Sequence, residues 1–340
     1  MRSLAAPALL LLASLPTQGL AEFDRSAFMR MATSTVRIEA LAADQHYNLG
    51  SGVVVAPGRV VTSCHVTASA PSIRVLYGGL RFPVKLQRAD IRHDLCMLDV
   101  PDLAAAPIRL GTTRSLQLGD RVVAMGFTGG YELQFADGVV RGLHTDGGLP
   151  IIKSSTAFSS GASGGGLFDG DGRLVGILTF RLRGTDDCYF SMPVDWFLPW
   201  IGSMDGFEPT RLLDEDRPLW MDAPQFQPAF LQAAALDAAH DWEGLKALGS
   251  GWTEREPDAA DAWLALGKAE FGMRRVDEAG RDLRRAVDLQ PRLAEAWFAL
   301  GRLYAEQHRV PELRQVHLRL DALDPTLAEQ LPVSGLAAVP

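Results

Sequence analysis

Three residues whose types could together catalyse acyl transfer occur along the chain in the order His65, Asp94 and Ser163. Ser163 stands in the segment GASGG, where glycines permit close backbone approaches that other residues forbid. A serine hydroxyl attacks poorly at neutral pH unless a base removes its proton, and imidazole titrates near that pH. The imidazolium that forms then needs a fixed negative partner. A fold that brings these three residues together could therefore catalyse acyl transfer through an activated serine.

The segments around these residues are predicted to be strands. In the run VVTSCHV, His65 stands just after a strand that begins beyond a Pro-Gly turn. Asp94 begins DLCMLDV, and DGDGRLVGILTF after Ser163 indicates a turn and a strand. GASGG also fits the G-x-S-x-G pattern of the α/β-hydrolase elbow, which needs a helix after the serine and the order Ser, acid, His. The predicted strand and the observed order both exclude that elbow.

Composition divides the chain into two domains. Residues 33–200 contain short β-branched runs separated by Gly, Pro and Asp turns, which predicts an all-β barrel or sandwich. From residue 226 onward Ala, Leu, Arg and Glu recur with helical spacing. The segment between them mixes prolines and acids without a period. We therefore predict a β domain at 22–202, a linker at 203–225, a helical domain at 226–330 and a tail at 331–340.

Three motifs in the β domain resemble those of trypsin-like serine peptidases, and within them the HtrA-type branch. They are GSGVVVAPGRVVTSCHV, HDLCMLDV and GASGGGLFDGDGRLVGILTF. The resemblance implies two six-stranded β-barrels with the active site between them. It also implies that His65 is the general base, Asp94 its orienting acid and Ser163 the nucleophile, with the backbone N–H groups of Gly161 and Ser163 as the oxyanion hole. Such a site requires no cofactor and no metal, and its substrates would be proteins or peptides.

The same resemblance implies a substrate pocket lined by Ala157, Thr179, Phe180 and Cys188. Ala157 stands where digestive trypsins carry a carboxylate, so cleavage after Lys or Arg is disfavoured. We expect small or medium apolar side chains before the scissile bond. Arg181, if directed into the cleft, would favour acidic groups nearby, and a solvated arginine is the alternative.

Two positions in the serine loop depart from the family pattern. Ala162 replaces the residue that receives a freed N-terminus in the digestive enzymes, so activation by N-terminal cleavage is not expected. Gly166 gives the backbone of this loop further conformational freedom. The loop is either accommodated as it is or held loosely until substrate arrives. These departures leave two hypotheses, which are an active serine endopeptidase and a catalytically silent scaffold that acts through its helical domain.

The first 21 residues are predicted to be a signal peptide. Arg2 is followed by an apolar stretch from Leu4 to Leu15, and small residues stand at Gly19 and Ala21. This stretch is shorter than the roughly 18 to 20 residues that span a bilayer. The mature chain would begin at Glu22 and be exported, periplasmic or secreted, without a membrane span. An uncleaved anchor is the alternative.

The formal net charge of −8 argues against binding to nucleic acid. The histidines His46, His93 and His144 lie in polar stretches without ligand spacing, and we expect them at the surface. The chain has three cysteines, Cys64, Cys96 and Cys188, too few and too scattered for a disulfide framework or a four-ligand zinc site. We expect all three as inert core residues, and a bridge between two of them is the alternative.

The helical domain contains an internal repeat with a period of 34 residues, the period of the tetratricopeptide repeat. The residues that recur with this spacing are Pro257, Pro291 and Pro325, Trp263 and Trp297, Leu266 and Leu300, and Gly267 and Gly301. About two and a half to three repeats are present. Stacked helix pairs form a concave groove that commonly binds proteins, so a protein partner is one function of this domain. The alternative is that this domain serves as a packing or dimerisation element.

Overall fold

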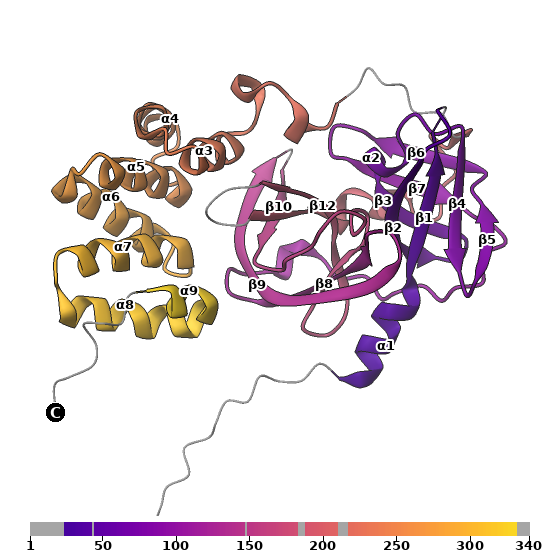
Figure 1. Cartoon of the computed structure of the whole chain (residues 1–340), viewed down its shortest axis with the longest axis horizontal. Helices are drawn as coiled ribbons and strands as arrows, with labels where there is room; N and C mark the ends of the chain where they lie inside the picture. The colour runs from indigo at the N-terminus through magenta and orange to yellow at the C-terminus, as the bar shows by residue number, and fades with distance from the viewer. Residues whose placement is uncertain (1–23, 43, 147, 183–187, 210–216, 332–340) are drawn as a thin grey trace, which may run out of the picture.

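The computed structural model of the 340-residue chain describes residues 24–42, 44–146, 148–182, 188–209 and 217–331. The predicted signal peptide and nearly all of the predicted tail lie outside the described residues. Among the residues described, no helix is long and apolar enough to cross a membrane. A short helix, two β units and an array of paired helices follow one another along the chain (Figure 1).

The first β unit is an antiparallel sheet of eight strands in the order β14-β6-β7-β3-β2-β1-β4-β5. Its strands are β1 (Thr35–Leu41), β2 (Tyr47–Ala56), β3 (Arg59–Ser63), β4 (Ser72–Tyr77), β5 (Leu80–Pro83), β6 (Leu86–Asp90), β7 (Leu95–Asp99) and β14 (Glu208–Pro209). The sheet is preceded by α1 (Arg25–Ser34) and interrupted by the one-turn helix α2 (Cys64–Thr67). This unit differs from the expected closed six-stranded barrel, because β5 and β14 extend it at its two edges.

The second β unit is a closed barrel of six strands in the order β10-β13-β12-β11-β8-β9. Its strands are β8 (Arg121–Thr128), β9 (Glu132–Asp146), β10 (Leu149–Ser154), β11 (Gly166–Asp169), β12 (Leu174–Leu182) and β13 (Cys188–Pro193). Side chains of Val122, Ile152, Leu167 and Leu178 fill its interior and are almost wholly buried. The predicted all-β first half of the chain is confirmed, and β12 is the strand predicted after Ser163.

Cys64 and Cys96 form a disulfide, with their Cα atoms 4.9 Å apart. The expectation that all three cysteines remain free was therefore wrong for these two. The reason is the antiparallel register of β3 against β7, which pairs Thr62 with Cys96, so that Cys64, two residues further along at the start of α2, lies diagonally opposite Cys96. The side chain of Cys188 lies outside the described residues.

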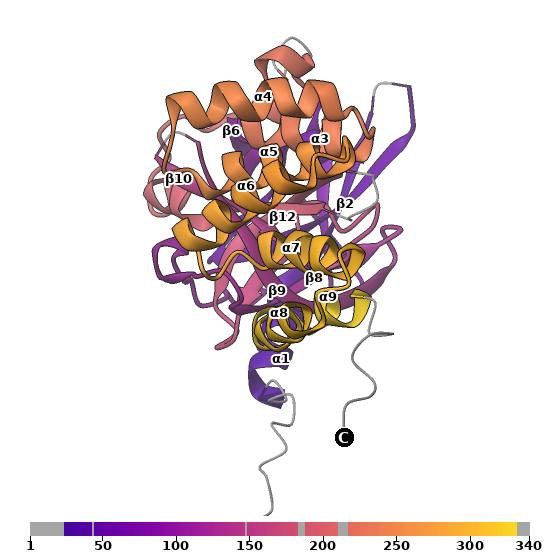
Figure 2. The same cartoon turned by 90° about the vertical axis from the view of Figure 1, so that its left-hand side faces the viewer.

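The second half of the chain is an array of helices, as predicted, and it has the 34-residue period. Its helices are α3 (Ala229–Ala238), α4 (Trp242–Arg255), α5 (Ala260–Gly272), α6 (Val276–Leu289), α7 (Ala294–Glu306), α8 (Val310–Leu323) and α9 (Pro325–Gln330). Two indole N–H groups that are 34 residues apart make the same hydrogen bond, Trp263 to the Pro257 carbonyl and Trp297 to the Pro291 carbonyl. Figure 2 shows these helices stacked in front of the second barrel.

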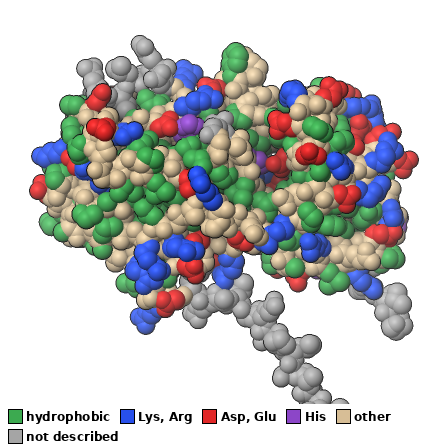
Figure 3. Space-filling model, turned by 180° about the vertical axis from the view of Figure 1, so that it is seen from behind, with side chains coloured by type: hydrophobic (Ala, Val, Ile, Leu, Met, Phe, Trp, Pro, Cys, Tyr) green, Lys and Arg blue, Asp and Glu red, His purple; other side chains and the backbone are tan. Residues whose placement is uncertain are grey.

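The helical array packs against the second barrel, and three of the polar pairs between them share one arrangement. In each pair the barrel supplies the basic side chain and the array the carboxylate: Arg141 with Asp324 (2.7 Å), Lys153 with Glu295 (2.7 Å) and His144 with Asp261 (3.1 Å). The expected surface position of His144 was wrong, because its ring also stacks on Phe230 with centroids 4.3 Å apart. Away from this contact, acidic, basic and apolar side chains are interspersed over the face shown in Figure 3.

The electrostatics of this contact are clearest at Glu295. Burial alone would raise the pKa of its carboxyl group, but the nearby ammonium groups of Lys153 and Lys268 outweigh that effect and lower the pKa to about 2. A carboxyl group whose pKa is lower in the folded than in the unfolded state stabilises the fold above its unfolded pKa, near 4.5. That stabilisation is lost as the pH falls through the folded value.

Replacing both bridged cysteines, Cys64→Ala with Cys96→Ala, should lower the free energy of unfolding by about 3 kcal/mol. The physical reason is that the bridge joins residues 32 positions apart and so restricts the unfolded chain. Urea titrations of both proteins measure the difference. A reductant should destabilise the wild type by a similar amount and leave the double variant unchanged. A wild type whose stability does not respond to reductant would contradict the bridge.

Glu295→Gln should lower the free energy of unfolding at pH 7, by on the order of 2 kcal/mol. The difference from the wild type should shrink as the pH falls from about 5 towards 2, because the wild-type carboxyl group then becomes protonated on unfolding. Urea titrations at several pH values measure it, with Glu254→Gln, at an exposed position on α4, as the control. A difference that stays constant over this range would show that the Lys153–Glu295 pair does not stabilise the fold.

Candidate active site

Asp94 and His65 form the centre of the candidate site. Asp94 is 1% exposed, and its Oδ2 lies 2.6 Å from His65 Nδ1, while its Oδ1 accepts the His65 backbone N–H at 2.8 Å. A carboxylate only accepts hydrogen bonds, so His65 Nδ1 carries the proton and Nε2 is left as an acceptor. Asp94 lies in the turn just before β7 with a φ of +56°, a conformation that non-glycine residues seldom adopt. The turn thus directs its carboxylate back onto α2.

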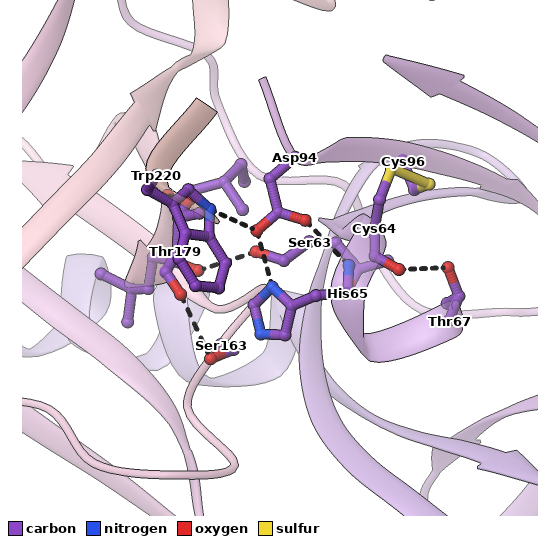
Figure 4. A network of polar contacts seen from close by, with 12 residues as sticks. Ser63, Cys64, His65, Thr67, Asp94, Cys96, Ser163, Thr179 and Trp220 are labelled. Atoms are coloured by element: carbon purple, nitrogen blue, oxygen red, sulfur yellow. Dashed lines mark hydrogen bonds and ion pairs between the residues drawn. A yellow bond between two sulfur atoms is a disulfide. The ribbon is translucent and has the colours of Figure 1, made fainter. Parts of the chain in front are cut away.

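Ser163 approaches this pair from the second barrel, on the loop between β10 and β11. Figure 4 shows its hydroxyl below the imidazole of His65. The hydroxyl donates to the Thr179 carbonyl oxygen at 3.4 Å, and within the described chain it makes no hydrogen bond to His65. Catalytic hydrogen bonds are often unformed before substrate binds, so this geometry is compatible with an activated serine.

The peptide unit before Gly161 has a fixed orientation. The Ser160 carbonyl accepts the Gly129 N–H at 2.8 Å, and in a trans peptide the N–H of Gly161 points the opposite way. Neither Gly161 nor Ser163 donates its backbone N–H to any described residue. Gly161 has a φ of +93°, and a Cβ there would lie 2.5 Å from the Phe127 carbonyl oxygen. The residue therefore has to be glycine, and two backbone donors in this loop remain available to a ligand.

Ser51 holds this loop against the first sheet, a role that the sequence did not reveal. Its N–H donates to the Ser163 carbonyl at 2.8 Å, its hydroxyl donates to the Gly161 carbonyl at 2.8 Å, and the same hydroxyl accepts the Phe127 N–H at 2.7 Å. Ser51 is fully buried in β2. Ala162 is buried as well, and its N–H bonds the Ser159 carbonyl. The loop is thus accommodated without the ion pair of the digestive enzymes.

The predicted pocket residues do not all face the same space. Ala157 and Arg181 line a cavity of about 280 Å³ together with Phe158, Ala162 and Tyr189. Thr179 is buried, and its hydroxyl bonds the Ile177 carbonyl. Phe180 is also buried and stacks on the ring of Trp220, a residue that no sequence motif indicated. Trp220 Nε1 lies 3.3 Å from Asp94 Oδ2.

His93 is half-buried, although its position beside Asp94 and its polar neighbours indicated a surface residue. Its Nδ1 lies 2.6 Å from Asp90 Oδ2, and its ring stacks on Trp196 with centroids 3.9 Å apart. The pair has the same geometry as His65 with Asp94, but its carboxylate is a different one. The imidazole that lies beside Ser163 in Figure 4 is that of His65.

Residues 50–177 match the family of trypsin-like peptidase domains, a range that includes His65, Asp94 and Ser163. The chain contains a trypsin-like peptidase domain. Residues 260–303 match the tetratricopeptide repeat, which confirms the repeat predicted from the 34-residue period. The active form of the Rv3671c protease from M. tuberculosis has a similar structure, with a TM-score of 0.50 at 21% identity over 61% of this chain and 96% of that one. This likeness supports the fold.

Curated proteins with similar sequences are described as serine endoproteases. A probable periplasmic serine endoprotease DegP-like from Ectopseudomonas mendocina (strain ymp) is 34% identical over 187 residues, which are 52% of this chain and 40% of that protein. One of the same description from Pseudomonas putida (strain W619) is 33% identical over 157 residues, which are 44% of this chain and 33% of that protein. The chain thus spans less than half the length of these relatives.

Ser51→Ala should slow the reaction of Ser163 with a fluorophosphonate, a reagent for activated serines, by about tenfold. The variant removes the hydrogen bond that fixes the Gly161 carbonyl and leaves the Phe127 N–H unpaired. The control is Ser34→Ala, another buried serine whose hydroxyl bonds a carbonyl, that of Ala106, outside the serine loop. Equal labelling rates in the two variants would show that Ser51 does not order the loop.

Proposed function

We propose that this chain is an exported serine endopeptidase that hydrolyses peptide bonds in proteins through an acyl-enzyme. The observation that carries the proposal is the 2.6 Å hydrogen bond between the buried Asp94 carboxylate and His65 Nδ1, with Ser163 beside the same ring. A carboxylate of this kind fixes the tautomer in which Nε2 can accept a proton. The likeness to curated serine endoproteases over the peptidase domain adds support.

In the proposed reaction, Ser163 Oγ attacks the carbonyl carbon of the scissile bond while His65 Nε2 takes its proton. The negative oxygen of the tetrahedral intermediate accepts the N–H groups of Gly161 and Ser163, and each such donor contributes about 10²- to 10³-fold in rate. The imidazolium, held by Asp94, then gives its proton to the leaving amine. Water then attacks the acyl-enzyme while His65 Nε2 takes its proton, and the imidazolium returns that proton to Ser163 Oγ as the acyl group leaves.

We propose that the side chain before the scissile bond is small or medium and apolar. The cavity beside the serine loop is lined by Ala157, Phe158 and Tyr189, and Ala157 supplies no carboxylate for a basic side chain. Arg181 lines the same cavity, so a substrate lysine or arginine would also meet a like charge. The assignment of Thr179, Phe180 and Cys188 to this pocket remains a proposal.

We propose a periplasmic location, with residues 1–21 as the signal peptide and 22–202 as the mature peptidase domain. The relatives are named periplasmic, and the bridge between Cys64 and Cys96 suits an oxidising compartment. Residues 203–225 would be the linker, 226–330 the repeat domain and 331–340 the tail. Three carboxylate pairs hold the repeat domain on the second barrel.

We propose that the repeat domain recruits a protein partner. It has a groove of about 740 Å³ lined by the aromatic rings of Trp242, Phe271 and Phe298 and by the guanidinium groups of Arg274 and Arg302. Arg302 lies over the ring of Phe271, 5.6 Å from its centroid. Asp237 and Glu306 also line the groove, and Glu306 pairs with Arg274, so the rings together with Arg302 favour a peptide segment that carries apolar side chains and an acidic group.

A second function, that of a catalytically silent scaffold, is favoured by one observation. The Ser163 hydroxyl bonds the Thr179 carbonyl, not His65. If that hydrogen bond persisted with substrate present, the hydroxyl would not be activated. The two functions differ in whether a reagent for activated serines reacts with the folded protein.

A fluorophosphonate should label the wild-type protein, and both Ser163→Ala and His65→Ala should lower the labelling rate by more than about 10³-fold. Mass spectrometry of the intact protein and of its peptides measures the extent and the site. The matched control is His93→Gln, because His93 bonds a carboxylate as His65 does, and it should be labelled like the wild type. Labelling that survives in Ser163→Ala would contradict the proposed nucleophile. A folded wild type that is not labelled would favour the scaffold.

A further inference from the structure

The interdomain segment, here residues 217–227, brings a tryptophan to the candidate active site. Trp220 lies on the short 3-10 helix Leu219–Met221 and donates its Nε1–H to Asp94 Oδ2 at 3.3 Å. Its ring meets the His65 imidazole edge to face, with centroids 5.6 Å apart and an angle of 86°. On the other side it stacks on Phe180 at 5.2 Å. Figure 4 shows the indole lying along the carboxylate and the imidazole.

The segment is anchored on both sides of Trp220. Leu219 is fully buried, and its N–H donates to the Arg92 carbonyl at 2.9 Å. Asp222 pairs with the Arg92 guanidinium at 3.2 Å. The Gln227 amide donates to the carbonyls of Trp220 and Asp222 at 3.1 and 2.9 Å. Arg92 itself stands two residues before Asp94, so the segment is bound to the same turn that carries the acid.

The indole completes the hydrogen bonding of the Asp94 carboxylate. Oδ1 accepts the His65 backbone N–H, and Oδ2 accepts both His65 Nδ1 and Trp220 Nε1. An indole N–H can only donate, so a carboxylate is a suitable partner, and a buried carboxylate is stabilised by each donor it receives. The ring also covers the pair from water, and a less polar surrounding strengthens the hydrogen bonds within it. Trp220 thus acts on both members of the pair.

We propose that Trp220 is a positioning residue for the His65–Asp94 pair, and that the active centre is complete only when the interdomain segment is docked. The proposal rests on the proposed peptidase function. Among the described residues Trp220 makes no hydrogen bond to Ser163, and it acts on the reaction through the carboxylate and the imidazole. The catalytic pair is therefore built from the peptidase domain together with the segment that leads to the repeats. The first of those helices, α3, is itself held to the barrel, where Phe230 stacks on His144.

Trp220→Phe in the full-length chain is the test. Phenylalanine keeps a ring that can stack on Phe180 and lacks the N–H donor. We expect kcat for peptide hydrolysis to fall by about fivefold to tenfold, with KM changed by less than about twofold, because a lost hydrogen bond to a charged group weakens the pair and leaves the substrate pocket intact. The matched control is Trp263→Phe, which removes an indole N–H that donates to the Pro257 carbonyl in the repeats. It should leave both constants unchanged.

A second readout does not need activity. The proton between His65 Nδ1 and Asp94 should give a strongly downfield proton resonance, assigned by its loss in His65→Ala, and Trp220→Phe should shift it while Trp263→Phe does not. If the wild type neither hydrolyses peptides nor reacts with fluorophosphonate, the peptidase function fails, and this resonance still tests the position of Trp220. An unchanged resonance in Trp220→Phe would overturn the proposal. So would an unchanged kcat in an active protein.

Discussion

The buried carboxylate of Asp94 is the constraint on which the catalytic half of the structure depends. A charge at 1% exposure is tolerated only where donors surround it, and here they come from α2 and from the interdomain segment. The backbone is fixed to match, because the Cys64 N–H donates to the Asp94 carbonyl and the disulfide joins Cys64 to Cys96. The bridge thus cross-links the chain just before the histidine to the strand just after the acid.

The serine loop has the opposite requirement, because it must keep two backbone N–H groups unpaired within a well-packed structure. Three of its carbonyls bond other segments: Ser160 accepts from Gly129, while Gly161 and Ser163 both accept from Ser51. Some of its N–H groups bond as well, Ala162 to the Ser159 carbonyl and Gly164 to the Leu178 carbonyl. The carbonyls of Ser160 and Ala162 accept the N–H groups of Gly129 and Gly165, so in trans peptides the N–H groups of Gly161 and Ser163 point the opposite way. The first sheet therefore orients Ser163, which the second barrel supplies, and neither β unit makes the candidate site by itself.

The sequence predicted the parts of this site that are local and missed those that join distant segments. His65, Asp94 and Ser163 stand in short motifs with strand patterns, and the repeats have a period that can be read by subtraction, so both were accessible. The bridge depends on the register between β3 and β7, which cysteine spacing does not encode. Trp220 lies in a segment without any period, 126 residues from the carboxylate it bonds. The strand β14 at one edge of the first sheet was missed for the same reason, since it pairs with β6 from far along the chain.

The repeat period also shapes how the two halves of the chain meet. Asp261 and Glu295 are 34 residues apart and occupy the second position of α5 and of α7, so one repeat position supplies two of the carboxylates that contact the barrel. Carboxylates near helix N-termini are favoured by the helix dipole, which makes this a stable place for them. In a fourth pair, Arg292 of the array supplies the basic group and Asp120, just before β8, the carboxylate. Both side chains of that pair are more exposed. Buried charge pairs define an arrangement more than they add affinity, because a shifted array would leave them unpaired. An array with one preferred position on the barrel also fixes the end of the Trp220 segment that leads into α3. The position of the repeats is therefore linked to the position of Trp220 beside the His65–Asp94 pair.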